Sequence, residues 1–297
     1  MKKTGLRKKA SALKIFLAVI LVIYTLVMVY LLLWAFTTSF KSHREFDVDR
    51  NYIGLPNKVV FDNFIAVFNN FTIPDPMNPG VEIGFAEQLM YTLLYAGVSC
   101  VLSAVAPFLM AYACYRFSFK FNKVIHVIVI MTMIIPIIGS TTSMIAILHD
   151  LNIYNTIFSV WCEKFSFANI YFLIYYGILR KIPKSFIEAA KIDGASELKV
   201  LTRVIFPVVV NVVLTVMLIY FIAYWNDYQT PLLYMPSYPT LAYGVYFVSN
   251  NTAASKGLNY ITVKMACSMT LIIPIMILFI IFRNKLMNNL SAGGVKE

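Results

Sequence analysis

The chain has 297 residues, of which 60% are hydrophobic and 13% are charged. Because a soluble domain usually carries about 25% charged residues, this composition excludes an ordinary soluble globule and indicates several membrane spans. The net charge of +11 does not indicate nucleic-acid binding, since Lys and Arg lie in short segments beside apolar runs, as membrane topology requires.

Six apolar segments are expected to be spans; a spanning helix needs about 20 apolar residues, and the fourth segment is shorter than this. The first, residues 15–36, follows a basic N-terminus, residues 1–14, and is longer than a signal-peptide core of about 7–15 residues. The polar segment 37–84 contains Pro74, Pro76 and Pro79 and is expected to be an extracytoplasmic loop with short helices such as 63–68. The remaining expected spans are 86–115, 124–148, 165–179, 208–233 and 261–282, and the tail is 283–297.

The fourth span is the least regular of the six. It lies within residues 153–179, and we expect Glu163 and Lys164 at the outer membrane interface, with the apolar part at 165–179.

The distribution of positive charge predicts the orientation of the chain. Most of the 25 Lys and Arg residues fall in the N-terminus, in the loop after the second span, between the fourth and fifth spans, and in the tail. Lys and Arg mark the cytoplasmic side. We therefore expect both termini in the cytoplasm of a multi-pass protein of the bacterial cytoplasmic membrane.

A polar segment, residues 183–207, separates the fourth and fifth expected spans. Pro183 suits the first position of a helix, Gly194 would end that helix in the left-handed conformation, and Ser196 can cap a second helix. Pro207 closes the segment before the fifth span. Two helices this short are barely stable alone, so either the protein's own helix ends or a groove on a cytoplasmic partner must hold this helical hairpin.

This hairpin resembles the signature loop of permease subunits of ATP-binding-cassette (ABC) importers, in which E-A-A is followed by G and then I-x-P. The matching residues are Glu188, Ala189, Ala190, Gly194, Ile205 and Pro207. The longer form found in sugar importers also matches at Ile182, Pro183, Ile192, Asp193, Ala195 and Ser196. Similar segments of the family occur at residues 110–123, 155–156 and 220–234, and the last eight residues resemble the tail of the smaller permease subunit of the maltose importer and its relatives.

The resemblance implies an all-α integral membrane protein with six transmembrane helices and the permease fold of type I ABC importers, with its core in residues 85–282. The hairpin would be the coupling helix, with Glu188, Ala189, Ala190, Asp193 and Gly194 at the contact with an ATPase subunit and Glu188 near basic groups of that subunit. The implied partners are a second permease subunit, two ATP-binding-cassette ATPase subunits and an extracytoplasmic solute-binding protein. The implied function is carbohydrate import, driven by ATP hydrolysis in a separate subunit.

The chain is not expected to be an enzyme itself. No GxxxxGK[ST] phosphate loop occurs in the sequence, so ATP and Mg²⁺ would be bound by the partner ATPase subunits. We expect no cofactor, no catalytic residue and no metal site in this chain.

Four consecutive residues are candidates for the substrate path: Tyr224, Trp225, Asn226 and Asp227. Aromatic rings stack on sugars, amides bind hydroxyl groups, and an ionisable residue within a span indicates function. Anchoring at the membrane interface explains the aromatic residues equally well, and a solvated helix end explains Asp227.

Two other classes of function remain as alternatives. A membrane-embedded transferase or hydrolase would need acid–base or metal-binding residues near one membrane face, as if Glu163, His149 and Asp150 converged. A secondary carrier would need charged residues in mid-membrane and inverted repeats, and the sequence shows neither pattern.

Overall fold

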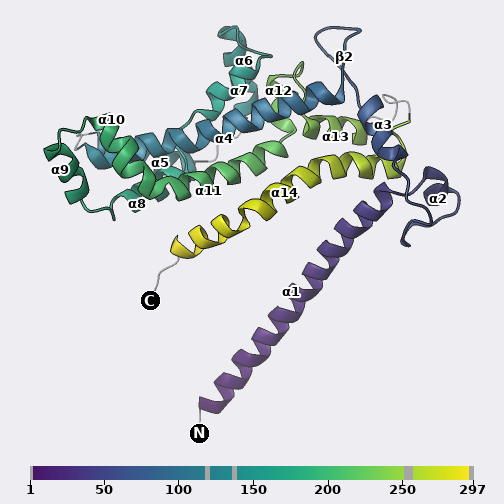
Figure 1. Ribbon diagram of the computed structural model, residues 1–297, viewed down its shortest axis with the longest axis horizontal. Coiled ribbons are helices and arrows are strands. Elements are labelled where there is room, and N and C mark those ends of the chain that lie inside the picture. Colours follow the sequence, from purple (N-terminus) through teal and green to yellow (C-terminus); the bar gives the residue numbers. More distant parts are fainter. Residues whose placement is uncertain (1–2, 118–120, 136–138, 251–256, 294–297) are drawn as a thin grey trace. The chain divides into compact units, whose positions relative to one another are not determined.

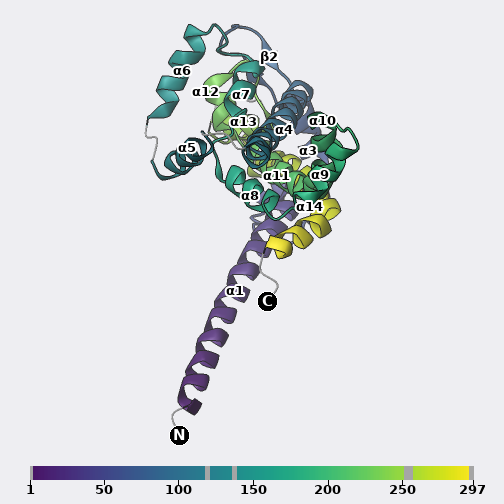
Figure 2. The ribbon, with the colours of Figure 1, turned by 90° about the vertical axis from the view of Figure 1, so that its left-hand side faces the viewer.

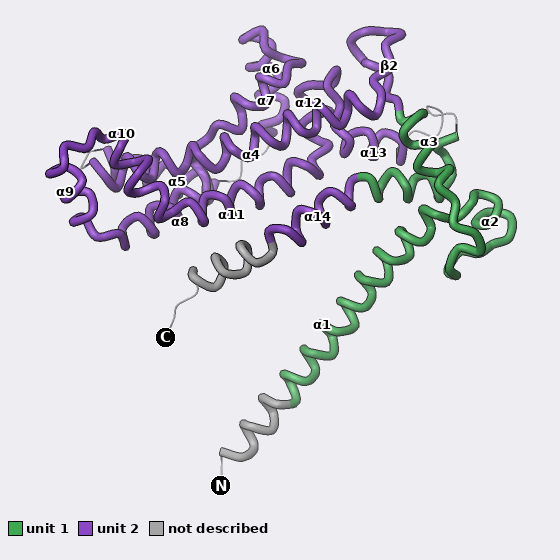
Figure 3. Tube along the Cα trace, viewed as in Figure 1, with its two compact units in different colours: residues 1–71, 251–270 green, residues 72–250, 271–297 purple. Residues whose placement is uncertain are grey.

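The computed structural model describes residues 3–117, 121–135, 139–250 and 257–293, with side chains from residue 12 to residue 282. The chain divides into two compact units (Figure 3): residues 1–71 with 251–270, and residues 72–250 with 271–297. Both are built mainly from helices (Figure 1).

The first unit begins with α1 (Lys3–Ser39), a single helix of 37 residues. It starts well before the expected span 15–36, because the basic N-terminal residues continue the helix. None of its most apolar window is buried within the protein. An apolar helix surface of this kind is stable in contact with lipid tails or another apolar helix.

The loop after α1 is folded by buried polar groups. It carries α2 (His43–Asp47) and α3 (Asp62–Asn70), and α3 confirms the short helix expected near residues 63–68. The fully buried Lys41 donates from Nζ to the carbonyl oxygen of Asn51 at 2.7 Å. Asn63 donates to the carbonyl oxygens of Ser39 and Lys41, each at 2.8 Å. These bonds offset the cost of removing polar groups from water.

The second unit is organised around α4 (Phe85–Arg116), which packs against α11 (Phe206–Trp225) and α8 (Ile170–Leu179). Ala96, Ala104 and Ala111 are fully buried on α4. Small residues of this kind let neighbouring helices approach closely. Figure 2 looks along the unit from one end, where α5 (Asn122–Ile134) lies beside α8.

Four helices among the described residues are long and apolar enough to cross a membrane: Ala12–Ser39, Phe85–Arg116, Glu197–Trp225 and Ile261–Phe282. The expected third and fourth spans are interrupted. Residues 124–148 form α5 and α6 (Ser140–Asp150), and Pro136 between them lies outside the described residues. The fourth expected span forms α7 (Ile157–Lys164) and α8, where Asn169 caps the first turn of α8. The 13 residues of α5 extend about 20 Å, less than the bilayer core of about 30 Å.

The fifth span differs from the expected one at both ends. The helix from α10 (Glu197–Lys199) through a π-helical segment, η1 (Val200–Ile205), to α11 is continuous. Pro207 lies in the first turn of α11 and does not end the segment. The wider π-helical turn directly before it gives room to the proline ring, which would clash with an ordinary helical turn. The span then ends at Trp225 and not at residue 233, because Asp227 caps a separate short helix, α12 (Gln229–Tyr234).

The last helix, α14 (Ile261–Gly293), starts where the sixth span was expected and extends beyond residue 282. Most of the segment 283–297 expected as a tail therefore continues the helix.

At the end of the second unit that carries α12 and α13 (Leu241–Asn250), Asp75 ties two loops together. It lies beside a short antiparallel pair, β1 (Ile73–Pro74) and β2 (Glu82–Ile83). Ser237 Oγ donates to Asp75 Oδ1 at 2.6 Å, Met77 N donates to the same atom at 2.9 Å, and Asn78 Nδ2 donates to Oδ2 at 2.6 Å. Burial raises the pKa of Asp75, but the hydrogen bonds from Asn78, Ser237 and Met77 together lower it below its usual range.

We predict that this contact fails at low pH. Since the pKa of Asp75 is lower in the folded chain, its carboxylate stabilises the loops above the unfolded-state pKa of about 3.9, and this contribution is lost as pH falls through the folded-state pKa. Hydrogen exchange at the Met77 amide, corrected for intrinsic rates, should be slow at pH 6 and faster below about pH 4. Asp75→Ala should speed exchange at pH 6 and remove this dependence, whereas Asp49→Ala, at an exposed carboxylate, serves as the control. Equal exchange in Asp75→Ala and the wild-type chain would contradict the role of Asp75.

Candidate functional site

The hairpin expected between the fourth and fifth spans consists of α9 (Ser185–Ile192), a tight turn, and α10. Gly194 has a φ of +75°, which confirms the left-handed conformation that the sequence predicts. The amide of Ala195 donates to the carbonyl of Ala190 at 2.9 Å and closes the turn. Ser196 caps α10, as expected, through a 3.4 Å bond from the Lys199 amide to its Oγ. Pro183 precedes α9 by two residues and is not its first residue.

One face of the hairpin packs against the helices and the other is exposed. Ile187 is buried, and Ala190 and Ala195 pack against the core formed by α4, α8 and α11. In contrast, Ile192 is 87% exposed and Leu198 is 69% exposed. These two side chains place apolar surface on the accessible face of an otherwise charged hairpin.

The five residues expected at the ATPase contact divide between these two faces. Glu188, Ala189, Asp193 and Gly194 are exposed, whereas Ala190 contributes to the packed face. Four of the five are therefore accessible to another molecule, two of them on α9 and two in the turn that follows it.

Two basic side chains hold the hairpin through one carboxylate. Arg116, the last residue of α4, donates from Nε to Glu197 Oε2 at 3.1 Å and from Nη2 to Oε1 at 2.9 Å. Lys191 Nζ lies 2.8 Å from the same Oε1. We call Glu197, Arg116 and Lys191 the Glu197 network. No local sequence pattern marks this network, because Arg116 and Glu197 are 81 residues apart and only the packing of α4 against the hairpin brings them together.

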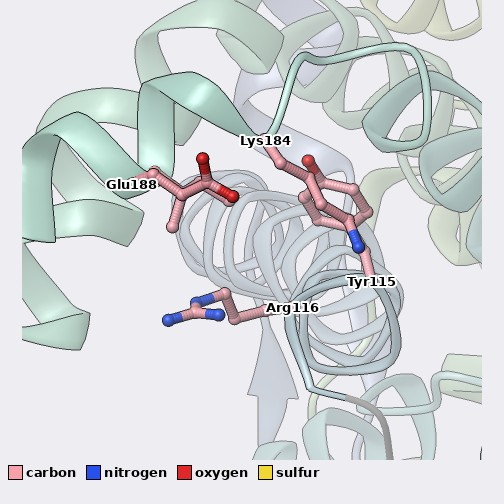
Figure 4. A pocket seen from close by; sticks show the side chains of 5 residues that line it. Tyr115, Arg116, Lys184 and Glu188 are labelled. Atoms are coloured by element: carbon pink, nitrogen blue, oxygen red, sulfur yellow. The ribbon is translucent and has the colours of Figure 1, made fainter.

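A small pocket of about 80 Å³ lies beside this network, lined by Tyr115, Arg116, Lys184, Ile187 and Glu188. In Figure 4 the carboxylate of Glu188 and the side chains of Arg116 and Lys184 surround this space. Glu188 therefore faces basic groups of its own chain. Tyr115 adds a further tie, since its hydroxyl donates to the carbonyl of Ile182 at 3.0 Å.

Of the four substrate-path candidates, Tyr224 belongs to a row of aromatic rings. Its ring stacks on Tyr220 with centroids 5.5 Å apart, and its hydroxyl lies 2.7 Å from Ser103 Oγ. The ammonium of Lys164 lies 5.2 Å from the centre of the same ring. The Tyr224 side chain is thus in contact with the ring of Tyr220, the hydroxyl of Ser103 and the ammonium of Lys164.

The other three candidates have partners within the chain. Trp225 is buried and its Nε1 donates to the carbonyl of Leu271 at 3.1 Å, and Asn226 Nδ2 donates to the carbonyl of Ile222 at 2.8 Å. Asp227 accepts a 2.7 Å bond from the Tyr95 hydroxyl and caps α12. These three contacts hold the end of α11 in place.

The Glu163–Lys164 pair, expected at the outer membrane interface, contacts α4 away from both ends of that helix. The two charges are 3.1 Å apart, and Ser103 Oγ donates to the Lys164 carbonyl at 3.1 Å. Ser103 lies about 27 Å along α4 from Phe85 and about 20 Å from Arg116. The pair therefore lies beside the middle part of α4.

Glu163, His149 and Asp150 do not form a metal-binding group in the described part of the chain. Among the described residues, no three His, Cys, Asp or Glu side chains gather closely enough to hold a metal ion. Glu163 pairs with Lys164, and the ring of His149 stacks on Tyr154 with centroids 4.1 Å apart.

Comparison with known proteins agrees with this architecture. The family described as binding-protein-dependent transport system inner membrane component matches residues 103–292. The melibiose/raffinose/stachyose import permease protein MelC of Bacillus subtilis (strain 168) is 26% identical over 296 residues, which are 98% of each chain. The probable starch degradation products transport system permease protein AmyC of Thermoanaerobacterium thermosulfurigenes is 25% identical over 95% of this chain and 96% of its own.

A solved structure shares the fold. It is a chain of a bacterial ABC transporter involved in the import of the acidic polysaccharide alginate, with a TM-score of 0.76 and 21% identity, covering 93% of this chain and 97% of that chain. The family match spans more than half of the chain and includes the end of α4, the hairpin and α11. The protein therefore belongs to the family of binding-protein-dependent transport system inner membrane components, as a multi-pass membrane protein.

Proposed function

We propose that this chain is a permease subunit of an ATP-driven, binding-protein-dependent importer for a carbohydrate. The observation that carries the proposal is the hairpin itself: a charged turn with exposed Ile192 and Leu198, fastened to the end of a membrane span in a member of this permease family. Support for a carbohydrate comes from the relatives, whose names specify melibiose, raffinose, stachyose and starch degradation products.

We infer six membrane crossings. The pairs α5/α6 and α7/α8 would each cross once as interrupted helices, which a bilayer tolerates where the broken backbone is covered by protein or lines a water-filled cavity. Six crossings place both termini on one side, and the distribution of Lys and Arg favours the cytoplasm. The hairpin would then lie in the cytoplasm.

In this orientation the hairpin would act as the coupling helix. Ile192 and Leu198 would enter a groove on an ATPase subunit, with Glu188, Ala189, Asp193 and Gly194 at its rim. ATP and Mg²⁺ would be bound by two such subunits. Closure of the ATPase pair would displace the hairpin and, through it, α4 and the α10–α11 helix. A second permease subunit would complete the membrane path, and a solute-binding protein would deliver the carbohydrate from outside.

The solute path is inferred to pass Tyr224. Its ring face suits a sugar ring, since ligand sites are lined by aromatic side chains with a few placed polar groups. The Glu163–Lys164 pair beside it supplies charged hydrogen-bonding groups for hydroxyls. Trp225, Asn226 and Asp227 then contribute by holding this part of α11.

A reconstituted importer tests the function. The chain is purified together with its second permease subunit and its ATPase subunits, placed in liposomes, and supplied with the solute-binding protein and labelled raffinose or maltotriose. We expect uptake that requires both ATP and the binding protein. Uptake of either sugar in liposomes that contain the chain without the ATPase subunit would contradict the proposal.

The turn at Gly194 gives a second test. A Cβ at this position would meet no neighbour within 4 Å, so a substitution is opposed by the backbone conformation alone. A β-branched residue at positive φ costs about 1–3 kcal/mol. We predict that Gly194→Val remains in the membrane but loses ATP-driven uptake.

The matched control is Gly177→Ala on α8, where a Cβ also meets no neighbour and φ is not positive. This variant should transport normally, because alanine favours a helix over glycine by about 1 kcal/mol. Normal uptake by Gly194→Val would show that the shape of the turn is not needed for transport.

A further inference from the structure

Three helical elements meet at a single side chain. Glu197 lies on α10, Lys191 on α9 and Arg116 at the end of α4, and all of their contacts are made within the second unit. Glu197 Oε1 pairs with Lys191 Nζ and accepts a hydrogen bond from Arg116 Nη2, and Glu197 Oε2 accepts a hydrogen bond from Arg116 Nε. Both carboxylate oxygens are thus used.

The geometry makes this contact stiff. The planar guanidinium of Arg116 binds the carboxylate with two parallel hydrogen bonds, which fix direction as well as distance. Isolated ion pairs on a surface contribute little to stability. Here, however, the Arg116 side chain is only 24% exposed, and a second cation shares the carboxylate. A network of this kind holds an orientation better than it raises stability.

The network links segments that the chain itself does not connect. The hairpin continues directly into α11 through η1 and follows α8 through residues 180–184, but α4 is distant in sequence. The π-helical turn of η1 begins three residues after Glu197. Such turns are local irregularities in the hydrogen-bond pattern and often occur at functional sites. A displacement of the hairpin therefore reaches α11 through this turn, whereas it reaches α4 through Glu197, the Tyr115–Ile182 bond and side-chain packing.

We propose that Glu197 is a positioning residue, which binds Arg116 and Lys191 so that displacement of the hairpin moves α4 together with α11. This inference rests on the proposed function and adds a residue outside the expected set of Glu188, Ala189, Ala190, Asp193 and Gly194. Without the network, the exposed Ile192 and Leu198 still face the ATPase subunit. Hydrolysis then continues while α4 follows less closely, through the Tyr115–Ile182 bond and side-chain packing alone, so that less solute moves for each ATP consumed.

The test measures ATP hydrolysis and solute uptake separately in the complete importer in liposomes, with raffinose or maltotriose as the probe. Glu197→Gln removes a charge with little change in volume, and Arg116→Gln removes a charge and shortens the side chain. We expect uptake per ATP to fall about tenfold, within the usual range for coupling between two sites, while hydrolysis stays within about twofold of wild type. The double variant should lose no more than either single variant, because both remove the same interaction.

The control is Lys199→Gln, which removes a charge from an exposed side chain on the same helix as Glu197. It should leave uptake per ATP unchanged. Arg116→Lys keeps the positive charge but cannot form the two parallel hydrogen bonds of the guanidinium. Its uptake per ATP should therefore lie between those of Arg116→Gln and the wild-type importer.

Three results would overturn the proposal. Glu197→Gln could show the same uptake per ATP as the wild-type importer, or the losses in the double variant could be additive. Hydrolysis and uptake could also fall in equal proportion in an importer that still copurifies with its ATPase. The last result would assign Glu197 a structural role alone. Absence of ATP-driven uptake in the wild-type importer is a separate outcome, which would count against the proposed function.

Discussion

The carboxylate of Glu197 joins the hairpin to the end of α4, together with the Tyr115–Ile182 bond and the packing of Ile187 and Ala190. Its two oxygens are shared by Arg116 and Lys191, so one acidic side chain orients both arms of the hairpin against the end of a membrane span. The left-handed turn at Gly194 then sets the direction of the exposed face. Ile192 and Leu198 are exposed because Ile187 and Ala190 fill the inner face.

Within the membrane-spanning part, the packing follows from side-chain size and polarity. Fully buried alanines let α4 lie close to its neighbours, α11 and α8. Beside the middle of α4, the Glu163–Lys164 pair meets the Tyr220–Tyr224 row where α7 ends and α8 has not yet begun. A broken helix exposes backbone groups that lipid cannot satisfy. Polar groups gathered at such a break are suited to a path that carries water and a hydroxylated solute.

Local signals predicted much of this structure. The apolar run of α1, the start of α14, the left-handed Gly194 and the Ser196 cap follow from composition and from short-range conformational preference. The interruption of the fourth span could not be read in the same way, because 165–179 holds no proline, its polar side chains other than tyrosine are only Ser166 and Asn169, and only Asn169, which caps α8, marks where the helix begins. The helix through Pro207 was missed because a π-helical turn has no composition of its own. The Glu197 network depends on a contact between distant segments, which no local pattern reveals.

The central claim is that the hairpin and α4 move as one body when ATP is bound. It is tested most directly by the distance between two spin labels, one at Ser185→Cys on α9 and one at Leu109→Cys on α4. Both positions are exposed and lie in the second unit. The exposed Cys162 is first replaced so that it takes no label. Pulsed electron paramagnetic resonance would compare the complete importer free of nucleotide with the same sample trapped with ATP. The account predicts the same distance distribution in both states of a transport-competent sample. A shift approaching one helical turn, about 5.4 Å, would contradict it.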